Sequence, residues 1–310
     1  SDWGHDFRHH YRLIERLSRN LPANLRLLAT TATANQRVMD DLCEILGPDL
    51  EVSRGSLVRQ SLQLQTLRYD SKAERMAWIC QAMDQMSGNG IIYTLTKRDA
   101  KFLAHWLLSK GHEVKSYTGD SKTEDRPILE EALLNNKVKA LVATQALGMG
   151  FGKPDLSFVF HFQAPGSVVS YYQQVGRAGR AIEHAHGVLL AGSEDLDITN
   201  FFIEVAFPSE KEVLQVIEAL DLAKKDLSIR DLQELINLGT KRIKQILMLL
   251  GLESPAPVVK VSSTWTRTAA PLNKEFLKRA NRLTALRKKE QAQMQEYVDL
   301  KEGHMAFLVE

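Results

Sequence analysis

The 310 residues of this chain are enough for two or three domains with their own hydrophobic cores. The composition, 44% hydrophobic and 25% charged residues, is ordinary for a globular protein. No apolar run approaches the roughly 20 residues that cross a bilayer, and the polar, aromatic N-terminus does not have the pattern of a signal peptide, so no membrane partner is expected.

The net charge of +2 hides an uneven distribution along the chain. Lysine and arginine outnumber aspartate and glutamate between Ser228 and Lys289, whereas the remainder of the chain is net acidic. A basic segment on a near-neutral protein is typical of a polyanion partner, and a solvated helical face is the alternative. Cys43 and Cys80 form no C-x-x-C pair, so we expect two small buried thiols in a reducing cytoplasm and predict no metal site.

Predicted elements before residue 54 are a helix over 7–17, a short buried strand over 25–30 and a helix over 35–46. Strands and helices then alternate to about residue 206. Strands are predicted at 90–94, 114–117, 140–144, 158–161 and 187–191, and helices at 97–110, 124–135 and 167–175. This alternation indicates an α/β fold, a parallel sheet with helices on both faces and ligands at the carboxyl ends of its strands.

The pattern becomes mostly helical after Pro208. Helices are predicted at 210–223, 229–235 and 241–250, followed by short strands at 258–261 and 265–267 and by a long basic helix over 272–300. Ser228 and Thr240 are suitable N-caps. The segment has the outline of a helix-turn-helix with a β-wing, which predicts a winged-helix-like domain.

The most informative stretch runs from Tyr171 to Arg180. Arg177 and Arg180 are three residues apart, so they lie on one face of a helical turn. Small residues around them let a phosphate approach, and each guanidinium offers a rigid fork of donors suited to a phosphoryl group. A solvated basic turn is the alternative for an isolated pair of this kind.

Three other segments precede this stretch in a set order: 28–34, 91–97 and 143–155. Each places threonine or glycine after a predicted strand, where hydroxyls and backbone N–H groups can hold phosphates. We therefore expect these segments and the arginine pair at the carboxyl ends of strands.

In this order the segments resemble the RecQ family of superfamily-two DNA helicases. Residues 31–33, 94–97, 144–155 and 174–180 resemble its motifs III, IV, V and VI, and residues 1–8 its aromatic-rich loop. The resemblance implies a RecA-like fold in four parts. These are the C-terminal part of a first lobe (1–53), a second lobe (54–207), a winged-helix-like DNA-binding domain (208–271) and a C-terminal helical segment (272–310).

The resemblance also implies roles for the matched residues. Arg177 and Arg180 would be arginine fingers on the γ-phosphate of ATP, supported by Gln174, and the nucleotide site would include Gly150 and Asp155. The nucleic-acid contacts it implies are Thr94, Lys97 and Thr144 on the tracked strand, Trp3, Phe7 and Arg8 on single-stranded bases, and Lys241 and Arg242 on phosphates. Packing on the following helix is the alternative for Trp3 and Phe7, and an exposed helical surface for Lys241 and Arg242.

Several family features are absent from the printed sequence. It contains no Walker A sequence and no acidic D-E-x-H-type box, which the family carries in its first lobe. We therefore expect a fragment of a longer protein that is inactive alone, with most ligands of ATP and Mg²⁺ elsewhere. Gly152, Ala181 and Thr118 stand where the family usually has aspartate, an acidic residue and histidine. The family's cysteine-rich zinc module is absent too, and His304, near the place of its first ligand, is expected to be a lone exposed histidine.

The predicted function is an ATP-dependent DNA helicase of RecQ type that translocates 3′ to 5′. Its expected partner is single-stranded DNA or a single-stranded/duplex junction, and its expected location is a bacterial-type cytoplasm, on the nucleoid. Two alternatives stay open: an RNA helicase, and a non-enzymatic nucleic-acid-binding adaptor with a degenerate helicase lobe.

Overall fold

A computed structural model describes residues 51–148, 150–223 and 225–309, together with residues 22, 28–30, 39 and 43. The chain divides into two compact units. One combines Arg54–Phe201 with Arg287–Glu310 and is called the sheet unit below. The other combines Ser1–Ser53 with Phe202–Leu286 and is called the helical unit. The assignment of these segments to helicase lobes and a DNA-binding domain stays a prediction.

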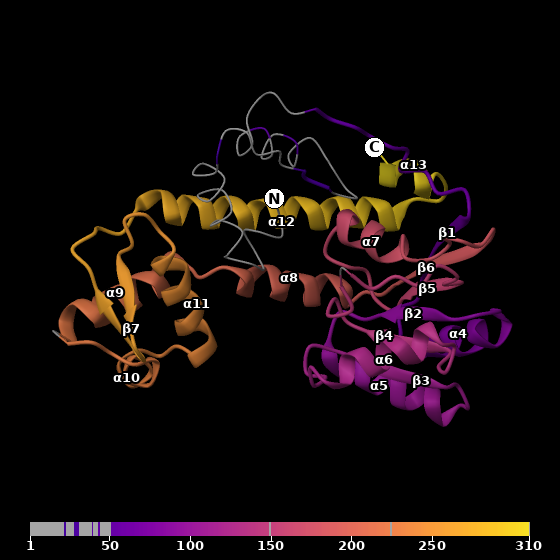
Figure 1. Ribbon diagram of the computed structural model, residues 1–310, viewed down its shortest axis with the longest axis horizontal. Coiled ribbons are helices and arrows are strands. Elements are labelled where there is room, and N and C mark those ends of the chain that lie inside the picture. The colour runs from indigo at the N-terminus through magenta and orange to yellow at the C-terminus, as the bar shows by residue number, and fades with distance from the viewer. Residues whose placement is uncertain are drawn as a thin grey trace. The chain divides into compact units, whose positions relative to one another are not determined.

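The sheet unit contains a parallel sheet of six strands in the order β1-β6-β5-β2-β4-β3 (Figure 1). Its strands are β1 (Leu62–Arg68), β2 (Gly90–Tyr93), β3 (Val114–Tyr117), β4 (Ala140–Ala143), β5 (Phe158–His161) and β6 (Ala185–Ala191). Every residue of β2, β4 and β5 is buried. Continuous apolar runs of this kind are typical of parallel strands covered on both faces.

Helices cover both faces of the sheet and form two cores. They are α4 (Lys72–Gln85), α5 (Lys97–Ser109), α6 (Asp125–Leu134), α7 (Val168–Val175) and α13 (His304–Val309), with the last turns of α12 (Lys274–Asp299). Figure 1 shows α4 and α5 on one face and α7 and α13 on the other. Neighbouring residues of a strand point to opposite faces, so Ile91 belongs to the core under α7 and Ile92 to the core under α4 and α5.

The helical unit packs three helices against a two-stranded antiparallel ribbon. Its elements are α9 (Glu210–Ala223), α10 (Ile229–Leu235), α11 (Thr240–Gly251), β7 (Val258–Val261) and β8 (Thr264–Arg267). Val216, Ile243, Leu247 and Trp265 are among the buried residues of its core. The three helices and the short ribbon are the elements that the sequence predicts here, and their assignment as a winged-helix-like domain stays a prediction. The boundaries between the two units fall between Ser53 and Arg54, within α8 (Asp195–Ala206) and within α12.

The predicted fold class is confirmed, with corrections outside the sheet. Leu28, Ala29 and Thr30 are exposed and have no regular secondary structure, so the buried strand expected there is not observed in these residues. A strand depends on ladder partners, and none of the strands that the structure describes pairs with them. The helices expected at 7–17 and 35–46 lie largely outside the described residues. Cys43 and Cys80 are partly exposed rather than buried. No described helix is both long and apolar enough to cross a membrane.

Candidate functional site

A buried polar pair lies where α7 crosses the sheet. His161 ends β5 and Gln174 lies in the last turn of α7, with 1% and 8% of their surfaces exposed. Nε2 of His161 is 2.8 Å from Oε1 of Gln174. Burial lowers the pKa of His161 to about 4. The ring is therefore neutral at pH 7, and it donates its Nε2 proton to the amide oxygen.

Arg177 follows α7 and is also buried, with 7% of its surface exposed. Its Nη1 donates to the carbonyl of Phe151 at 2.8 Å. The guanidinium lies near the phenol of Tyr93, whose hydroxyl donates to the carbonyl of Leu147 at 3.1 Å. Burial raises the pKa of Tyr93 to about 12, opposed by the charge of Arg177. Arg177 and Tyr93 thus hold the glycine-rich loop over residues 144–155 in place.

Arg180 differs from Arg177 because its side chain is exposed. Its one described hydrogen bond is a long contact from Nε to the carbonyl of Gly176, 3.5 Å. Burial, then Arg177, then Arg59 lower the pKa of Arg180. In the described part of the chain no carboxylate forms an ion pair with Arg180, so guanidinium charge gathers here with a free fork of donors. Such a cluster suits an anionic ligand.

Arg59 and Ser61 hold the turn that carries Arg180. Nη2 of Arg59 donates to the carbonyls of Ala178 and Gly179 at 3.2 and 3.0 Å, and Oγ of Ser61 donates to Gly179 at 2.6 Å. Gly179 has a φ of 67°, and a Cβ there would lie 2.8 Å from Oγ of Ser61. Only glycine fits this turn without strain. The sequence analysis missed Arg59 because no motif surrounds it.

The arginine turn does not lie at the carboxyl end of a strand, which corrects the expectation from the sequence. The N–H of Gly179 donates to Leu156 at 3.0 Å, and the N–H of Ala185 donates to Ser61 at 2.8 Å. The turn therefore lies beside the residues that lead into β5, β6 and β1. The reason is that α7 follows β5 and returns across the sheet to the edge where parallel strands begin.

The loop over residues 144–155 begins at the end of β4 and reaches this turn. Gly150 has a φ of 99°, a conformation that favours glycine. Asp155 is paired with Nζ of the buried Lys153 at 2.8 Å, and this hydrogen bond lowers the pKa of the Asp155 carboxyl. The N–H of Ala181 donates to the carbonyl of Pro154 at 2.8 Å. The loop and the arginine turn thus form one hydrogen-bonded assembly.

Thr94 and Thr144 lie together at the carboxyl ends of the neighbouring strands β2 and β4. The N–H of Thr94 donates to Ala143 at 2.8 Å, and its hydroxyl donates to the carbonyl of Thr96 at 3.1 Å. Thr144 accepts from the N–H of Ala146 at 3.4 Å. Lys97, in the first turn of α5, is exposed and pairs with Asp120 at 2.5 Å. These three predicted phosphate contacts therefore share one edge of the sheet.

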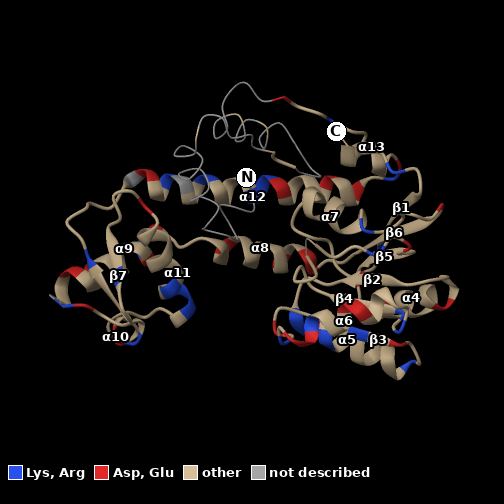
Figure 2. Ribbon diagram, in the orientation of Figure 1, with Lys and Arg blue, Asp and Glu red and all other residues tan. Residues whose placement is uncertain are grey.

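The other predicted nucleic-acid contacts belong to other segments of the chain. Trp3, Phe7 and Arg8 lie outside the described residues. Lys241 and Arg242 belong to the first turn of α11, where Figure 2 shows a group of basic residues. Arg242 is held by Glu212 at 2.9 Å and by the carbonyl of Val205 at 2.9 Å, whereas Lys241 is exposed. Lys241 is thus the better placed of the two to meet a phosphate.

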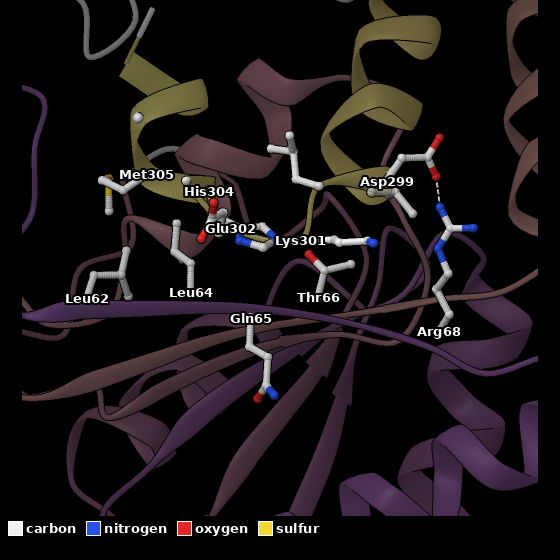
Figure 3. Close-up of a pocket in the computed structure, with 14 residues that line it drawn as sticks. Leu62, Leu64, Gln65, Thr66, Arg68, Asp299, Lys301, Glu302, His304 and Met305 are labelled. Atoms are coloured by element: carbon white, nitrogen blue, oxygen red, sulfur yellow. Dashed lines mark ion pairs between the residues drawn. The ribbon is translucent and has the colours of Figure 1, made fainter.

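A cavity of about 1000 Å³ lies elsewhere in the sheet unit, between β1 and the connection from α12 to α13 (Figure 3). Arg68 and Asp299 form an ion pair at its rim. His304 lines the cavity, and its ring packs edge-on against Tyr297 at 5.2 Å between centroids. The expectation of a lone exposed histidine is therefore wrong: α13 packs on the sheet and partly buries His304, which lowers its pKa.

Comparison with known proteins supplies the family. The helicase conserved C-terminal domain matches residues 74–182. The chain is 34% identical to the ATP-dependent DNA helicase RecQ of Bacillus subtilis over 68% of its own length. It is 28% identical to the probable ATP-dependent DNA helicase RecS of the same organism over 80%, and 37% identical to the putative ATP-dependent DNA helicase Q1 of Caenorhabditis briggsae over 58%. The chain belongs to the RecQ family.

Its RecQ relatives are longer than the part this chain matches. The chain spans 36% of the length of RecQ, 51% of RecS and 30% of the Q1 helicase. Among solved structures, S. cerevisiae Dbp5 bound to RNA and ADP BeF3 superposes with a TM-score of 0.53 at 24% identity, over 62% of this chain and 52% of that one. This likeness shows the shared RecA-like fold.

The departures from the usual RecQ residues have structural counterparts. A Cβ on Gly152 would lie 3.2 Å from Nη1 of Arg180, so the aspartate that RecQ proteins usually carry here would start beside that guanidinium. Glycine leaves Arg180 without this neighbour. Thr118 is buried, and its hydroxyl accepts from the N–H of Asp120 at 3.3 Å. It therefore serves a local turn where a histidine is usual.

Proposed function

We propose that this RecQ-family chain is part of an ATP-dependent DNA helicase that translocates 3′ to 5′. The observation that carries the proposal is the exposed guanidinium of Arg180, which has buried arginine charge beside it and no carboxylate partner in the described chain. An arginine held in this way suits the charge that develops on a phosphoryl group during transfer. The relatives' names support ATP as the nucleotide and DNA as the nucleic acid.

In this proposal the residues of the arginine turn and of the loop over residues 144–155 have different roles. Arg180 contacts the γ-phosphate of ATP, the substrate whose hydrolysis drives translocation. Arg177 fixes the loop that runs past Gly150 and Asp155, and Gln174, bound to His161, orients the last turn of α7. Mg²⁺, when bound, would neutralise phosphate charge. The printed sequence contains neither an acidic D-E-x-H-type box nor a Walker A loop. The ligands of Mg²⁺ and the Walker A loop would therefore belong to a first lobe.

The DNA strand would follow the edge of the sheet that carries Thr94, Lys97 and Thr144. Lys97 offers an exposed ammonium group to a phosphate and Thr144 offers a hydroxyl, whereas the hydroxyl of Thr94 would have to release the carbonyl of Thr96 before it could donate to the next phosphate. Trp3, Phe7 and Arg8 would stack on or sense single-stranded bases, and Lys241 on α11 would add a phosphate contact. Single-stranded DNA, or its junction with a duplex, is the proposed partner, in a bacterial-type cytoplasm on the nucleoid.

The test replaces Arg180 in the protein that carries this chain together with a first RecA-like lobe. R180A is expected to lower kcat for DNA-stimulated ATP hydrolysis by about 10³-fold or more, the range of arginine fingers, with affinity for single-stranded DNA unchanged. R180K is expected to recover little, because an ammonium group lacks the planar fork. The exposed Arg230 provides the control, and R230A should leave kcat unchanged.

Three further results decide between the proposal and its alternatives. Undiminished ATP turnover in R180A would overturn the assignment and favour a non-enzymatic adaptor. Stronger stimulation by RNA than by DNA would favour an RNA helicase. Displacement of a strand from a duplex with a 5′ tail, but not from one with a 3′ tail, would reverse the proposed polarity.

A further inference from the structure

Three side chains with metal-binding donor atoms converge on the far side of the sheet unit from α7. Cys80 and Asp84 lie on α4, and His112 follows α5. Nε2 of His112 is 3.3 Å from Sγ of Cys80 and 3.7 Å from Oδ1 of Asp84. The donor atoms of the three all lie within 4.8 Å of one another. No other set of this kind occurs among the residues that the structure describes.

The arrangement differs from that of a Cys-His-Asp catalytic triad. In a triad the histidine meets the nucleophile with one ring nitrogen and the carboxylate with the other. Here the thiol and the carboxylate both lie near Nε2. A proton cannot pass from sulfur through the ring to the carboxylate in this geometry. Three donors that surround one point are instead the pattern of a metal site.

We propose that Cys80, Asp84 and His112 bind a Zn²⁺ ion, with water as the fourth ligand. Thiolate, imidazole and carboxylate are the three ligand types that zinc combines. Zinc–ligand bonds of about 2.0–2.3 Å at tetrahedral angles place donor atoms about 3.3–3.6 Å apart. The observed separations from Nε2, 3.3 and 3.7 Å, are close to this spacing. A small rotation of the exposed Asp84 side chain would complete the set.

The local structure favours these positions. Cys80 and Asp84 are four residues apart on α4, so their side chains share one face of the helix. His112 is held by the N–H···O bond from its backbone to Leu107 at 3.1 Å, after Gly111 turns the chain with a φ of 93°. The His112 side chain is 10% exposed and that of Asp84 is 71% exposed. The site is thus anchored on one side and open to solvent on the other.

The charges around the site are mixed. Burial and then Asp84 raise the pKa of the Cys80 thiol, whereas Lys110 lowers it. Zn²⁺ would reverse the effect of burial because it stabilises the thiolate directly, and the thiol proton would leave to solvent. The ion would link the last two turns of α4 to the turn before β3, at the edge where β2 and β3 begin. We infer a structural role for it, since Thr94 and Thr144 lie at the opposite ends of the strands.

The test measures Zn²⁺ binding to the 310-residue chain after removal of metals with a chelator. Isothermal titration is expected to show one Zn²⁺ per chain, and Zn²⁺ should raise the Tm of the sheet unit. Co²⁺ should produce a tetrahedral visible spectrum with a thiolate-to-metal charge-transfer band. C80S should abolish that band, and H112Q and D84N should each weaken Zn²⁺ binding about tenfold or more.

The matched controls are C43S, which removes the other thiol, and H105Q, which removes an exposed imidazole on α5. Both variants should bind Zn²⁺ as the parent does. The proposal is overturned if the parent chain binds no Zn²⁺, or if C80S binds it with unchanged affinity. Loss of the charge-transfer band in C43S rather than in C80S would assign the metal to another thiol and would also overturn it.

Discussion

The buried ring of His161 makes the stability of the sheet unit depend on pH. Burial holds its pKa at about 4, below the 6.5 of an exposed histidine. The unfolded chain therefore takes up a proton first as the pH falls. The contribution of His161 to the free energy of unfolding is expected to be constant above pH 6.5 and to fall by about 3 kcal/mol between pH 6.5 and 4. Asp195, whose pKa burial raises to about 6, makes an opposite contribution below pH 6. Urea unfolding followed across this range measures the slope.

The variant H161Q tests which group causes this loss. Glutamine keeps a donor for Gln174 but carries no charge at any pH. The fall in the free energy of unfolding below pH 6.5 should therefore become smaller by about 3 kcal/mol, even if the variant is less stable overall. H105Q changes an exposed ring and should keep the slope of the parent. An unchanged slope in H161Q would show that another group takes up the proton.

Several described helices of both units begin at residues whose side chains accept hydrogen bonds from the first turn. Ser71 caps α4, Thr96 caps α5, Ser167 caps α7 and Ser228 caps α10. In α10 the cap is reciprocal: Oγ of Ser228 accepts from the N–H of Asp231 at 3.2 Å, and Asp231 accepts from the N–H of Ser228 at 2.8 Å. A helix of seven residues has few internal hydrogen bonds, so this capping box matters most there.

Replacement of Ser228 tests the contribution of the cap to α10. S228A should destabilise the helix by about 1 kcal/mol, because the N–H of Asp231 loses its acceptor. S228G should cost only a few tenths of a kcal/mol, since glycine lets water reach the free N–H group. Hydrogen exchange of a peptide over residues 229–236 measures the difference. Equal exchange in S228A and S228G would show that the cap is not the stabilising feature.

For the whole molecule, the sheet unit is completed by residues that lie far away in the sequence. Met294, Tyr297 and Val298 of α12 and Leu308 of α13 belong to the same core as β1 and α7. The side chain of Tyr297 is fully buried, and its ring centroid lies 4.9 Å from that of Tyr171. These residues close one face of the sheet.

Removal of the Tyr297 ring should therefore destabilise the sheet unit, although the strands of that unit lie about a hundred residues or more before Tyr297 in the sequence. Y297A is expected to destabilise the sheet unit by about 3–5 kcal/mol, the usual cost of an aromatic-to-alanine change in a core. Y297F keeps the ring and should cost about 1 kcal/mol or less. Hydrogen exchange in β1 and α7 reports the loss. Unchanged protection in Y297A would show that the sheet unit is stable without this cover.

The sequence predicted well where structure is local. The elements at 114–117, 158–161, 210–223 and 229–235 have the predicted bounds, because periodic apolar residues and turn residues lie within each segment. The predicted list omitted β1, α4, α8 and α13. The last of these packs its apolar residues into the core that it shares with β1, α7 and α12, and its own short sequence carries little pattern.

The sequence alone determined the family, the parallel α/β sheet and the residues of the arginine motif, since motif spacing and periodicity are properties of the chain. Only the tertiary structure decided how those residues differ. It buried Arg177 against Phe151, left Arg180 exposed, and placed Arg59 under their turn. It also brought His112 to Cys80 and Asp84. Burial and convergence of this kind arise from contacts between segments far apart in the sequence, which no local pattern encodes.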